Sequence, residues 1–329
     1  MQVLVTGGAG CIGSHFVRRL IAAGDRVTVL DKLTYSGNRA NLEGLDVAFV
    51  HGDICDADAV TRAAEGCEAI VNFAAETHVD RSILEAGDFI QTDVFGTHVL
   101  LERAREAGIR LLHVSTDEVY GDVPEGSSSV EDDAIRPSSP YSASKAGGDL
   151  QVLAYVRTYG VDAVITRGSN TYGPNQYPEK LIPLFVTNAL VGEPLPVYGD
   201  GTQVRDWLHV DDHCAGIELV LRRGASGEVY NVGGGEEVEN REITRRILEL
   251  TGADPSLVRS VADRPGHDRR YSLATDKLRA LGWAPARTLA EGLPETVEWY
   301  RANRAWWEPI KSGEYRAYYD RQYAARLRA

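Results

Sequence analysis

Gln2-Val-Leu-Val-Thr-Gly-Gly-Ala-Gly-Cys-Ile-Gly13 is the stretch that decides the fold, because an apolar strand runs directly into a glycine-rich turn. Gly7, Gly10 and Gly13 form a G-x-x-G-x-x-G loop. The apolar residues after it recur at helical spacing, namely Ile12, Phe16, Val17 and Leu20, up to a helix-ending Gly24. Glycines in such a loop let the backbone approach a pyrophosphate, and the following helix N-terminus favours its negative charge. The stretch therefore predicts the start of a dinucleotide-binding domain.

The first half of the chain alternates between strand and helix patterns. We expect strands at Val3–Val5, Arg26–Leu30, Val47–His51, Ala69–Phe73, Arg110–Ser115 and Asp162–Arg167. We expect helices after Gly10, from Asp56 to about Gly66, over Asp88–Ala107 and over Tyr141–Tyr159, the last with Pro140 near its start. This alternation predicts an α/β fold, with a Rossmann-type, doubly wound parallel sheet covered by helices on both faces.

The pattern changes after about Arg167, where prolines and glycine-rich turns become frequent. This composition predicts a smaller C-terminal α/β lobe that binds the substrate. We expect residues 1–170 to form the dinucleotide-binding domain and residues 171–329 to form mainly the second lobe. The helical pattern of Asp211–Arg223 predicts a return to the first domain near residues 205–232.

Charge and cysteine content exclude several classes of function. The formal net charge of −13 over 329 residues argues against a nucleic acid or an anionic membrane as partner. Four scattered cysteines without paired ligand spacing indicate reduced thiols, no metal site and a cytoplasmic protein. The chain starts with a strand, so we expect no signal peptide, and no apolar run is long enough to span a membrane.

Asp31 stands at the end of the second expected strand. An acid at this position can bind the ribose hydroxyls of a dinucleotide, and it would repel a 2′-phosphate. The sequence thus predicts NAD rather than NADP as the cofactor.

Two adjacent acids, Asp117 and Glu118, directly follow the expected strand Arg110–Ser115. Ligands bind at the carboxyl ends of strands in open parallel sheets. Two carboxyls there can supply one acid and one base to a single substrate, if the site separates their proton affinities.

Tyr141 and Lys145 lie four residues apart on one expected helix and so share a face. Free tyrosine has a pKa of about 10 and is a poor base at neutral pH. A nearby ammonium favours the phenolate, so we expect Lys145 to help Tyr141 accept a proton from a hydroxyl while hydride leaves the same carbon.

The glycine loop together with Tyr141-Ser-Ala-Ser-Lys145 resembles extended short-chain dehydrogenase/reductases that act on nucleotide sugars. Further motifs narrow the resemblance to the dTDP-glucose 4,6-dehydratases: Thr116-Asp-Glu-Val-Tyr-Gly121, Asp31-Lys-Leu-Thr-Tyr-Ser-Gly-Asn38, Ala74-Ala-Glu-Thr-His-Val-Asp-Arg-Ser82, Pro178-Glu-Lys-Leu-Ile-Pro183, Arg205-Asp-Trp207 and Asp263-Arg-Pro-Gly-His-Asp-Arg-Arg-Tyr271. These motifs extend over nearly the whole chain.

The resemblance implies a lyase that uses tightly bound NAD without consuming it. Tyr141 matches the residue that accepts the sugar 4-OH proton, while NAD takes hydride from C4 and later returns it to C6. Glu118 matches the base that removes the C5 proton, and Asp117 matches the acid that protonates the departing C6 hydroxyl. Thr116 matches a residue that hydrogen-bonds near the 4-OH, and Lys145 completes the implied catalytic group.

Binding roles follow from the same resemblance. It implies NAD contacts at Gly7, Gly10, Cys11, Ile12, Gly13, Asp31, Lys32, Leu33, Thr34, Ser36, Gly37, Asp53, Ile54, Phe73, Ala74, Ala75, Glu76, Thr77, Thr92, Tyr141, Lys145 and Thr171. It implies contacts to dTDP-glucose at Thr77, Thr116, Asp117, Glu118, Asn170, Lys180, Leu181, Pro196, Val197, Tyr198, Arg205, Asn240, Asp263, Arg264 and His267. A guanidinium forks onto phosphate oxygens, so Arg205 is the best candidate for the diphosphate.

The sequence departs from the family at two positions. Cys11 stands where the family usually has Phe, and we expect it to be a small packing residue rather than a reactive thiol. Thr171 stands where a second Asn is usual, which puts one cofactor hydrogen bond in doubt. Chain segments after Gly24 and Arg105 that look short for the family hint at an antibiotic deoxysugar pathway.

For one histidine and for the aromatic C-terminal segment we expect packing roles. We expect His113 to be packed within its strand, and the aromatic tail from Trp299 to Tyr323 to pack the C-terminal helix. The resemblance also implies that the helices Asp88–Ala107 and Tyr141–Tyr159 pair into a four-helix homodimer interface.

Two other functions stay open at this point. A nucleotide-sugar 4-epimerase or decarboxylase shares the glycine loop and Tyr-x-x-x-Lys, but such enzymes generally lack the Asp-Glu pair. A non-catalytic NAD-binding scaffold protein is disfavoured because Thr116, Asp117, Glu118, Tyr141 and Lys145 are all present.

Overall fold

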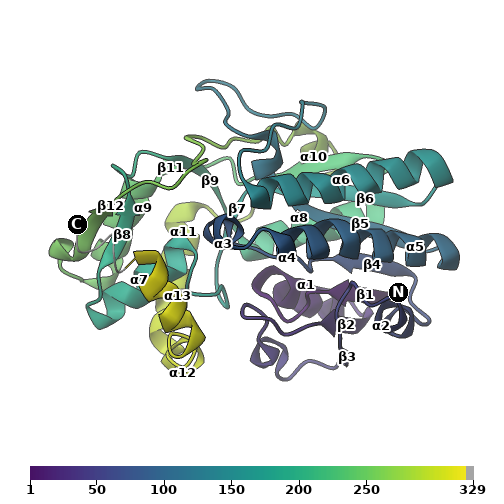
Figure 1. Ribbon diagram of the computed structural model, residues 1–329, viewed down its shortest axis with the longest axis horizontal. Coiled ribbons are helices and arrows are strands. Elements are labelled where there is room, and N and C mark those ends of the chain that lie inside the picture. Colours follow the sequence, from purple (N-terminus) through teal and green to yellow (C-terminus); the bar gives the residue numbers. More distant parts are fainter. Residues whose placement is uncertain (324–329) are drawn as a thin grey trace.

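A seven-stranded parallel sheet forms the larger part of the molecule in the computed structural model, which describes residues 1–323 (Figure 1). The strand order is β10-β6-β5-β4-β1-β2-β3, in which the chain crosses over after β3 and continues outward from β1 in the opposite direction. This order confirms the Rossmann-type, doubly wound α/β fold. The strands are β1 (Gln2–Thr6), β2 (Arg26–Asp31), β3 (Ala48–His51), β4 (Ala69–Asn72), β5 (Arg110–Thr116), β6 (Ala163–Gly168) and β10 (Val229–Val232).

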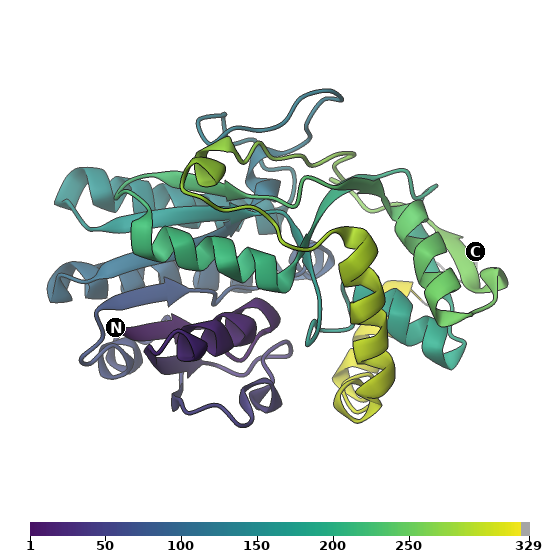
Figure 2. The same cartoon turned by 180° about the vertical axis from the view of Figure 1, so that it is seen from behind.

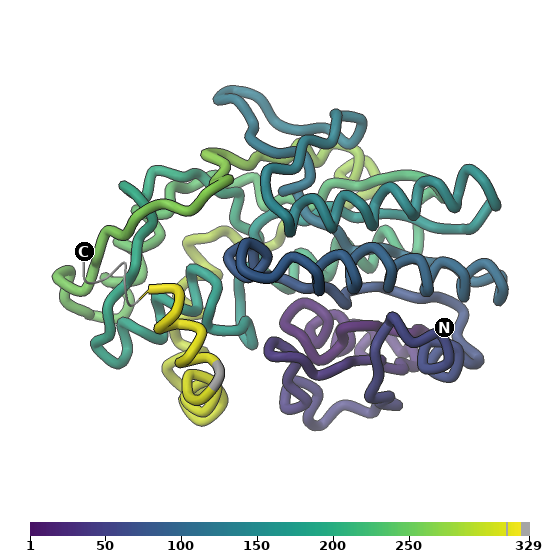
Figure 3. Tube along the Cα trace, in the orientation of Figure 1, coloured from purple at the N-terminus to yellow at the C-terminus, as the bar shows by residue number. Residues whose placement is uncertain are grey.

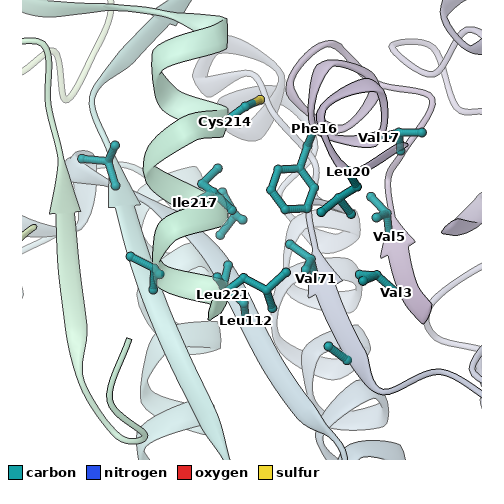
Figure 4. Close-up of a cluster of buried hydrophobic side chains, with 14 of the residues drawn as sticks. Val3, Val5, Phe16, Val17, Leu20, Val71, Leu112, Cys214, Ile217 and Leu221 are labelled. Atoms are coloured by element: carbon teal, nitrogen blue, oxygen red, sulfur yellow. The ribbon is translucent and has the colours of Figure 1, made fainter. Parts of the chain in front are cut away.

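Helices cover both faces of this sheet. On one face, α1 (Cys11–Ala22) lies beside α8 (Val210–Arg223), and Phe16 and Leu20 meet Ile217 and Leu221 over the strands (Figures 2 and 4). The other face carries α2 (Ala57–Ala63), α5 (Thr97–Ala107) and α6 (Pro140–Tyr159). Strands that are buried on both faces explain the continuous apolar runs in the sequence.

Capping residues set several of these helix boundaries. Asp56 accepts hydrogen bonds from the backbone of Asp58 and Ala59 at the start of α2. Ser139 caps α6 in a reciprocal capping box with Ser142, and Pro140 fills the first turn. Gly160 ends α6 with a left-handed φ of 69°.

The expected helix Asp88–Ala107 is wrong in detail, because it is not one regular helix. The structure has α4 (Gly87–Phe89), a π-helix η2 (Ile90–Gly96) and then α5, and it adds a short helix α3 (Val79–Leu84) that periodicity did not reveal. The wider π turn lies against α6 at two glycines, Gly147 and Gly148, where there is no room for side chains.

A second lobe packs around its own apolar core beyond the strand ends. It contains the helices α7 (Leu181–Val191), α9 (Asn240–Thr251), α11 (Leu289–Ala302), α12 (Arg304–Trp307) and α13 (Glu314–Tyr323). Its strands are β7 (Asn170–Tyr172), β9 (Val204–His209) and β11 (Glu237–Glu239) in one small sheet, and β8 (Leu195–Tyr198) with β12 (Val258–Val261) in another. Short elements complete the chain: η1 (Arg39–Leu42), η3 (Asp117–Tyr120), η4 (Pro255–Leu257) and α10 (Asp276–Ala280).

The chain passes between the two lobes more than once, as the trace in Figure 3 shows. After β9, helix α8 and strand β10 return to the large sheet, where β10 pairs with β6. The aromatic tail packs inside the second lobe, as expected: Trp307 is 1% exposed, and Tyr315, Tyr318, Tyr319 and Tyr323 are all buried. None of the helices formed by residues 1–323 is long and apolar enough to cross a membrane.

Candidate functional site

The turn formed by Gly7, Gly10 and Gly13 has no side chains at these positions, so a ligand can contact its backbone. Gly7 has a φ of +66°, and a Cβ there would lie 2.6 Å from the Ala74 nitrogen, while a Cβ at Gly13 would lie 2.3 Å from the Gly7 oxygen. Helix α1 starts directly after the turn, and no side chain caps its free N–H groups. A narrow, uncapped helix start of this kind fits the pyrophosphate of a dinucleotide.

Asp31 ends β2 beside this turn. Its Oδ2 accepts a hydrogen bond from the Ala9 nitrogen (2.8 Å), and its Oδ1 accepts one from the Leu33 nitrogen (2.8 Å). Burial raises the pKa of Asp31, and these two backbone N–H groups partly offset that rise. The carboxyl is thus fixed at the mouth of the turn, as adenosine ribose binding requires.

One continuous cavity runs from the glycine turn past the ends of β4, β5 and β6 to the second lobe. It brings together most of the residues that the sequence predicted. These are Gly7, Gly10, Cys11, Ile12, Gly13, Asp31, Lys32, Thr34, Ser36, Gly37, Asp53, Ile54, Phe73, Ala74, Ala75, Glu76, Thr77, Thr92, Thr116, Asp117, Glu118, Tyr141, Lys145, Asn170, Thr171, Lys180 and Leu181.

Nine predicted residues do not line this cavity. They are Leu33, Pro196, Val197, Tyr198, Arg205, Asn240, Asp263, Arg264 and His267. Val197 lines a separate cavity between β8 and α9. Tyr198 and Arg264 instead hold Asp80, through Tyr198 Oη to Asp80 Oδ2 (2.7 Å) and Arg264 Nη1 to Asp80 Oδ1 (3.2 Å).

The acid pair is held by a 3₁₀ turn at the end of β5. Thr116 caps this turn: its hydroxyl accepts from the Glu118 nitrogen (3.3 Å) and donates to Asp117 Oδ1 (3.2 Å). Asp117 is 3% exposed, and its Oδ2 has no hydrogen-bond partner within residues 1–323. Both carboxyls line the cavity, so the two groups are available to one substrate.

Different surroundings separate the proton affinities of the two acids. The pKa of Asp117 is raised well above its usual value by burial and by the negative charges of Glu118 and Asp206. Burial also raises the pKa of Glu118, but the cations Arg264, Lys180 and Arg205 oppose that rise. The arrangement favours a protonated Asp117 beside an ionised Glu118, which is an acid next to a base.

Tyr141, on α6, lines the same cavity as the acid pair. Its pKa is raised well above 10 by burial and by the charges of Glu118 and Asp93. The Lys145 ammonium is buried and donates to the Val114 carbonyl at 2.9 Å. In the chain alone, burial and nearby carboxylates hold the pKa of Tyr141 high, and the expected help from Lys145 stays a prediction.

Arg205 is more constrained than the sequence suggested. Its guanidinium donates to the carbonyls of Val204, Asp268 and Arg269 at 2.8 to 3.3 Å and stacks 4.3 Å from the centre of the Tyr271 ring. Three of its N–H groups are thus already used. Lys180, which lines the cavity, is the more accessible cation in this part of the molecule.

The comparisons with known proteins agree with this geometry. Residues 4–296 match the family model described as GDP-mannose 4,6 dehydratase. A dTDP-glucose 4,6-dehydratase from Streptomyces niveus is 56% identical over 324 residues, which cover 95% of this chain and 96% of that protein. The dTDP-glucose 4,6-dehydratase from Shigella flexneri is 45% identical over 99% of this chain and 100% of its own length.

The chain belongs to the dTDP-glucose 4,6-dehydratase family. Among solved structures, the dTDP-glucose 4,6-dehydratase DesIV from Streptomyces venezuelae, with NAD and TYD bound, is 58% identical with a TM-score of 0.92, covering 94% of this chain and 100% of that one. A UDP-glucose 4-epimerase from Thermus thermophilus has a TM-score of 0.88 at 36% identity over 92% of this chain and 100% of that one. The fold is therefore shared with epimerases, and sequence identity separates the dehydratase family from them.

The structure shows the surroundings of Cys11 and Thr171, the two residues that depart from the usual family sequence. Cys11 Sγ contacts the Pro174 carbonyl at 3.4 Å, and burial raises its pKa to about 12, which fits the expected packing role. The Thr171 hydroxyl lies 2.7 Å from His213 Nδ1 and lines the cavity. His113 is 1% exposed inside β5, as expected.

Several cavity residues escaped the sequence analysis. Glu179 has a side chain that is 2% exposed and pairs with Arg81 at 2.8 Å. His213 reaches the cavity from α8, and Trp207 and Ser169 reach it from the second lobe and the end of β6. Glu179 and Trp207 stand inside motifs that carry the family resemblance but were assigned no role, whereas no local pattern marked His213 or Ser169. No group of three or more side chains suited to a metal ion occurs within residues 1–323.

Proposed function

We propose that this chain dehydrates dTDP-glucose to dTDP-4-keto-6-deoxyglucose with NAD as a recycled cofactor. The observation that carries the proposal is the pair Asp117 and Glu118, which share one cavity with Tyr141 but differ in their surrounding charges. A 4-epimerase needs only redox chemistry at C4, and it has no use for an acid and a base of this kind beside its tyrosine.

The residues of the glycine turn and of the neighbouring strand ends would hold NAD. The uncapped start of α1 suits the pyrophosphate, Asp31 suits the adenosine ribose, and Lys145 suits the nicotinamide ribose. When bound, NAD supplies a hydride acceptor for C4 and a hydride donor for C6, with a positively charged nicotinamide ring in the oxidised form.

Tyr141 acts first as a base. Burial and carboxylates keep its phenol protonated in the chain alone, so proton removal becomes favourable only when positive charge enters the cavity. Tyr141 then accepts the 4-OH proton as C4 is oxidised, and the Thr116 hydroxyl orients this end of the sugar.

Glu118 and Asp117 then remove water. The new C4 ketone acidifies the C5 proton, which the ionised Glu118 accepts. The electron pair of the C5–H bond forms a C5–C6 double bond, and the C6 oxygen leaves with the proton of Asp117 as water. General acid and base groups of this kind typically contribute factors of about 10² to 10⁴ each.

The substrate diphosphate and base would lie toward the second lobe. Lys180 and Asn170 line this end of the cavity, and Arg205 and Arg264 add positive charge close enough to affect Glu118. We also propose that the substrate is contacted by the remaining predicted residues, at Pro196 to Tyr198, Asn240, Asp263 and His267.

We propose the same domain division as above, in which residues 1–170 and the segment that returns near residues 205–232 bind NAD. The pairing of β10 with β6 supports this division.

We further propose a cytoplasmic homodimer that works in a deoxysugar pathway, such as one for an antibiotic. Large apolar side chains are exposed on neighbouring helices, at Ile90 and Phe95 of η2 and at Leu150 and Tyr159 of α6. Helices with such faces suit a four-helix interface between two copies. A single-chain mass in light scattering would contradict the dimer.

A product assay tests the proposed activity. We expect the purified chain to convert dTDP-glucose to a product lighter by one water, without added NAD, because bound cofactor is regenerated in each cycle. UDP-glucose and GDP-mannose, incubated separately, should turn over more slowly. An unchanged sugar, or a product of unchanged mass with galactose configuration, would contradict the dehydratase assignment.

A further inference from the structure

Asp206 is a buried acid next to the proposed active site, on strand β9. It is 1% exposed, and the register of β9 with β7, in which Trp207 lies opposite Asn170, brings it beside the cavity residue Ser169. Its Oδ1 accepts a hydrogen bond from the Glu236 nitrogen at 3.1 Å, but its Oδ2 has no partner within residues 1–323. The Gly235 backbone and the Ser169 hydroxyl lie close enough to favour the charged form of this carboxyl, but no cation within residues 1–323 forms an ion pair with it. A buried carboxyl without a counter-charge is costly, which calls for a functional explanation.

Backbone, rather than a counter-charge, holds this carboxyl in place. A Cβ at Gly233 would lie 2.5 Å from Asp206 Oδ2, and one at Gly234 would lie 2.0 Å from the Trp207 carbonyl. Asp206 also lies opposite Glu237 in the antiparallel pairing of β9 with β11. The turn at Gly233 and Gly234 thus encloses the Asp206 carboxyl tightly, and Glu237, the charged side chain opposite it, is also negative.

Asp117 is the functional group that this arrangement affects. Its Oδ2 is also buried without a partner. Thr116 pairs with Gly168 in β5 and β6, and Asn170 pairs with Trp207 in β7 and β9, so Asp117 and Asp206 both lie level with the intervening residue Ser169. The negative charges of Glu118, on the same turn, and of Asp206, on β9, raise the pKa of Asp117, and the positive charge of Arg205 lowers it. Asp206 therefore reaches the proposed acid from a separate strand.

We propose that Asp206 is a positioning residue that keeps a proton on Asp117 until the C6 hydroxyl of the sugar leaves. This inference rests on the proposed dehydration, in which Glu118 takes the C5 proton, the C5–H electron pair forms the C5–C6 double bond, and the proton of Asp117 leaves with the C6 oxygen as water. Asp206 takes no part in bond making. A second negative charge beside Asp117 makes early loss of its proton costly.

Because Asp206 and Asp117 both titrate, this role makes the activity depend on pH. Burial, with a contribution from Glu237, raises the pKa of Asp206 to about 7. Asp206 is therefore ionised mainly above pH 7, and there its charge raises the pKa of Asp117 further. Removing that charge lowers the pKa of Asp117, so Asp117 loses its proton, and with it activity, at a lower pH.

The substitution Asp206→Asn tests this, because the amide keeps the volume and an oxygen acceptor for the Glu236 nitrogen. We expect kcat to match the wild type within about twofold near pH 6, and the alkaline limb of the pH profile to move down by about one pH unit, so that kcat falls about tenfold at a given pH on that limb. KM should stay within about twofold. A purely structural defect would lower the rate at every pH and would overturn the proposal.

Asp212→Asn is the matched control. Asp212 is 4% exposed, follows shortly after β9, and its Oδ2 also accepts from a backbone nitrogen, that of Arg287, at 2.9 Å. The control loses a buried carboxylate in the same way but is not among the charges that act on Asp117. We expect no movement of its alkaline limb, and an equal shift in both variants would overturn the proposal.

A substrate with fluorine in place of the C6 hydroxyl separates this role from others. Fluoride leaves without a proton, so the charge state of Asp117 no longer matters, and the deficit of Asp206→Asn on the alkaline limb should shrink to less than about twofold. A deficit that persists with fluoride would overturn the proposal. If the Asn variant does not fold, Asp206→Ser provides the same comparison. A wild type that forms no dehydrated product would refute the proposed function itself.

Discussion

Glu118 shows how one residue acquires its role from its neighbours. It is adjacent to Asp117 in the chain, and burial raises the pKa of both carboxyls. Cations from β9, from the residue before α7 and from the loop after β12 act on Glu118, whereas carboxylates dominate around Asp117. Two adjacent acids with nearly identical chemistry thereby acquire different proton affinities.

Glu118→Gln should uncouple oxidation from elimination. The amide cannot accept the C5 proton, so we expect exchange of that proton with solvent deuterium to slow by about 10² to 10⁴-fold. Oxidation at C4 depends on Tyr141, so the absorbance of reduced nicotinamide should still appear and should persist longer than in the wild type. Tyr141→Phe is the control, because it should prevent that absorbance. Exchange at the wild-type rate would show that Glu118 is not the base.

Chain order predicted which residues of the site come together, but not their charge states. The motifs gave Thr116, Asp117 and Glu118 because strand ends in parallel sheets meet at one edge. The raised pKa of Tyr141 was not predictable, because it depends first on burial and then on Glu118 and Asp93, which are distant from it in sequence. Local spacing placed Tyr141 and Lys145 on one helix face but gave no sign of these carboxylates, which the tertiary fold brings close to Tyr141.

At the scale of elements, the π-helix η2 determines how α5 and α6 approach each other. Its wide turn carries Asp93, whose Oδ2 accepts from Ser144 on α6 at 2.6 Å. The approach needs glycine on α6, since a Cβ at Gly148 would lie 2.8 Å from the Asp93 carbonyl. Apolar periodicity predicts a helix here but carries no signal for a change from α to π hydrogen bonding, which explains the error in the expected helix.

Gly148→Ala should therefore destabilise the fold although alanine favours helices. The added methyl must displace the backbone of η2, which corresponds to an overpacked core and costs about 1–3 kcal/mol. Urea denaturation would measure the free energy of unfolding. Gly87→Ala is the matched control, because a Cβ there meets nothing within 4 Å and the change should be neutral or slightly stabilising. Equal effects in the two variants would contradict the close packing.

At the scale of the whole molecule, aromatic and charged side chains tie the C-terminal helix to both lobes. The Arg81 guanidinium lies between the rings of Tyr35 (3.6 Å) and Tyr318 (4.1 Å), and its Nε donates to Glu179 at 2.8 Å. Tyr315 adds a hydrogen bond to the Pro178 carbonyl at 2.9 Å. Residues from the NAD side, the substrate side and α13 thus meet at one point beside the cavity, a convergence that no local sequence pattern predicts.

Arg81→Met should test whether this convergence stabilises the molecule. The substitution keeps much of the packing but leaves Glu179, whose side chain is 2% exposed, without its partner at 2.8 Å. Breaking a buried pair in this way costs about 3–5 kcal/mol, which should lower the melting temperature by several degrees and the urea midpoint with it.

The double variant with Glu179→Gln should recover a large part of the loss, because no uncompensated buried charge remains. Arg105→Met is the control: its pair with Glu102 lies at the surface, with side chains 43% and 31% exposed, and surface pairs contribute at most about 1 kcal/mol. If Arg81→Met lowers the free energy of unfolding no more than Arg105→Met does, the contacts of Arg81 are not what joins α13 to the two lobes. If instead the double variant is as unstable as Arg81→Met, the loss arises from the aromatic contacts of the guanidinium rather than from the stranded carboxylate.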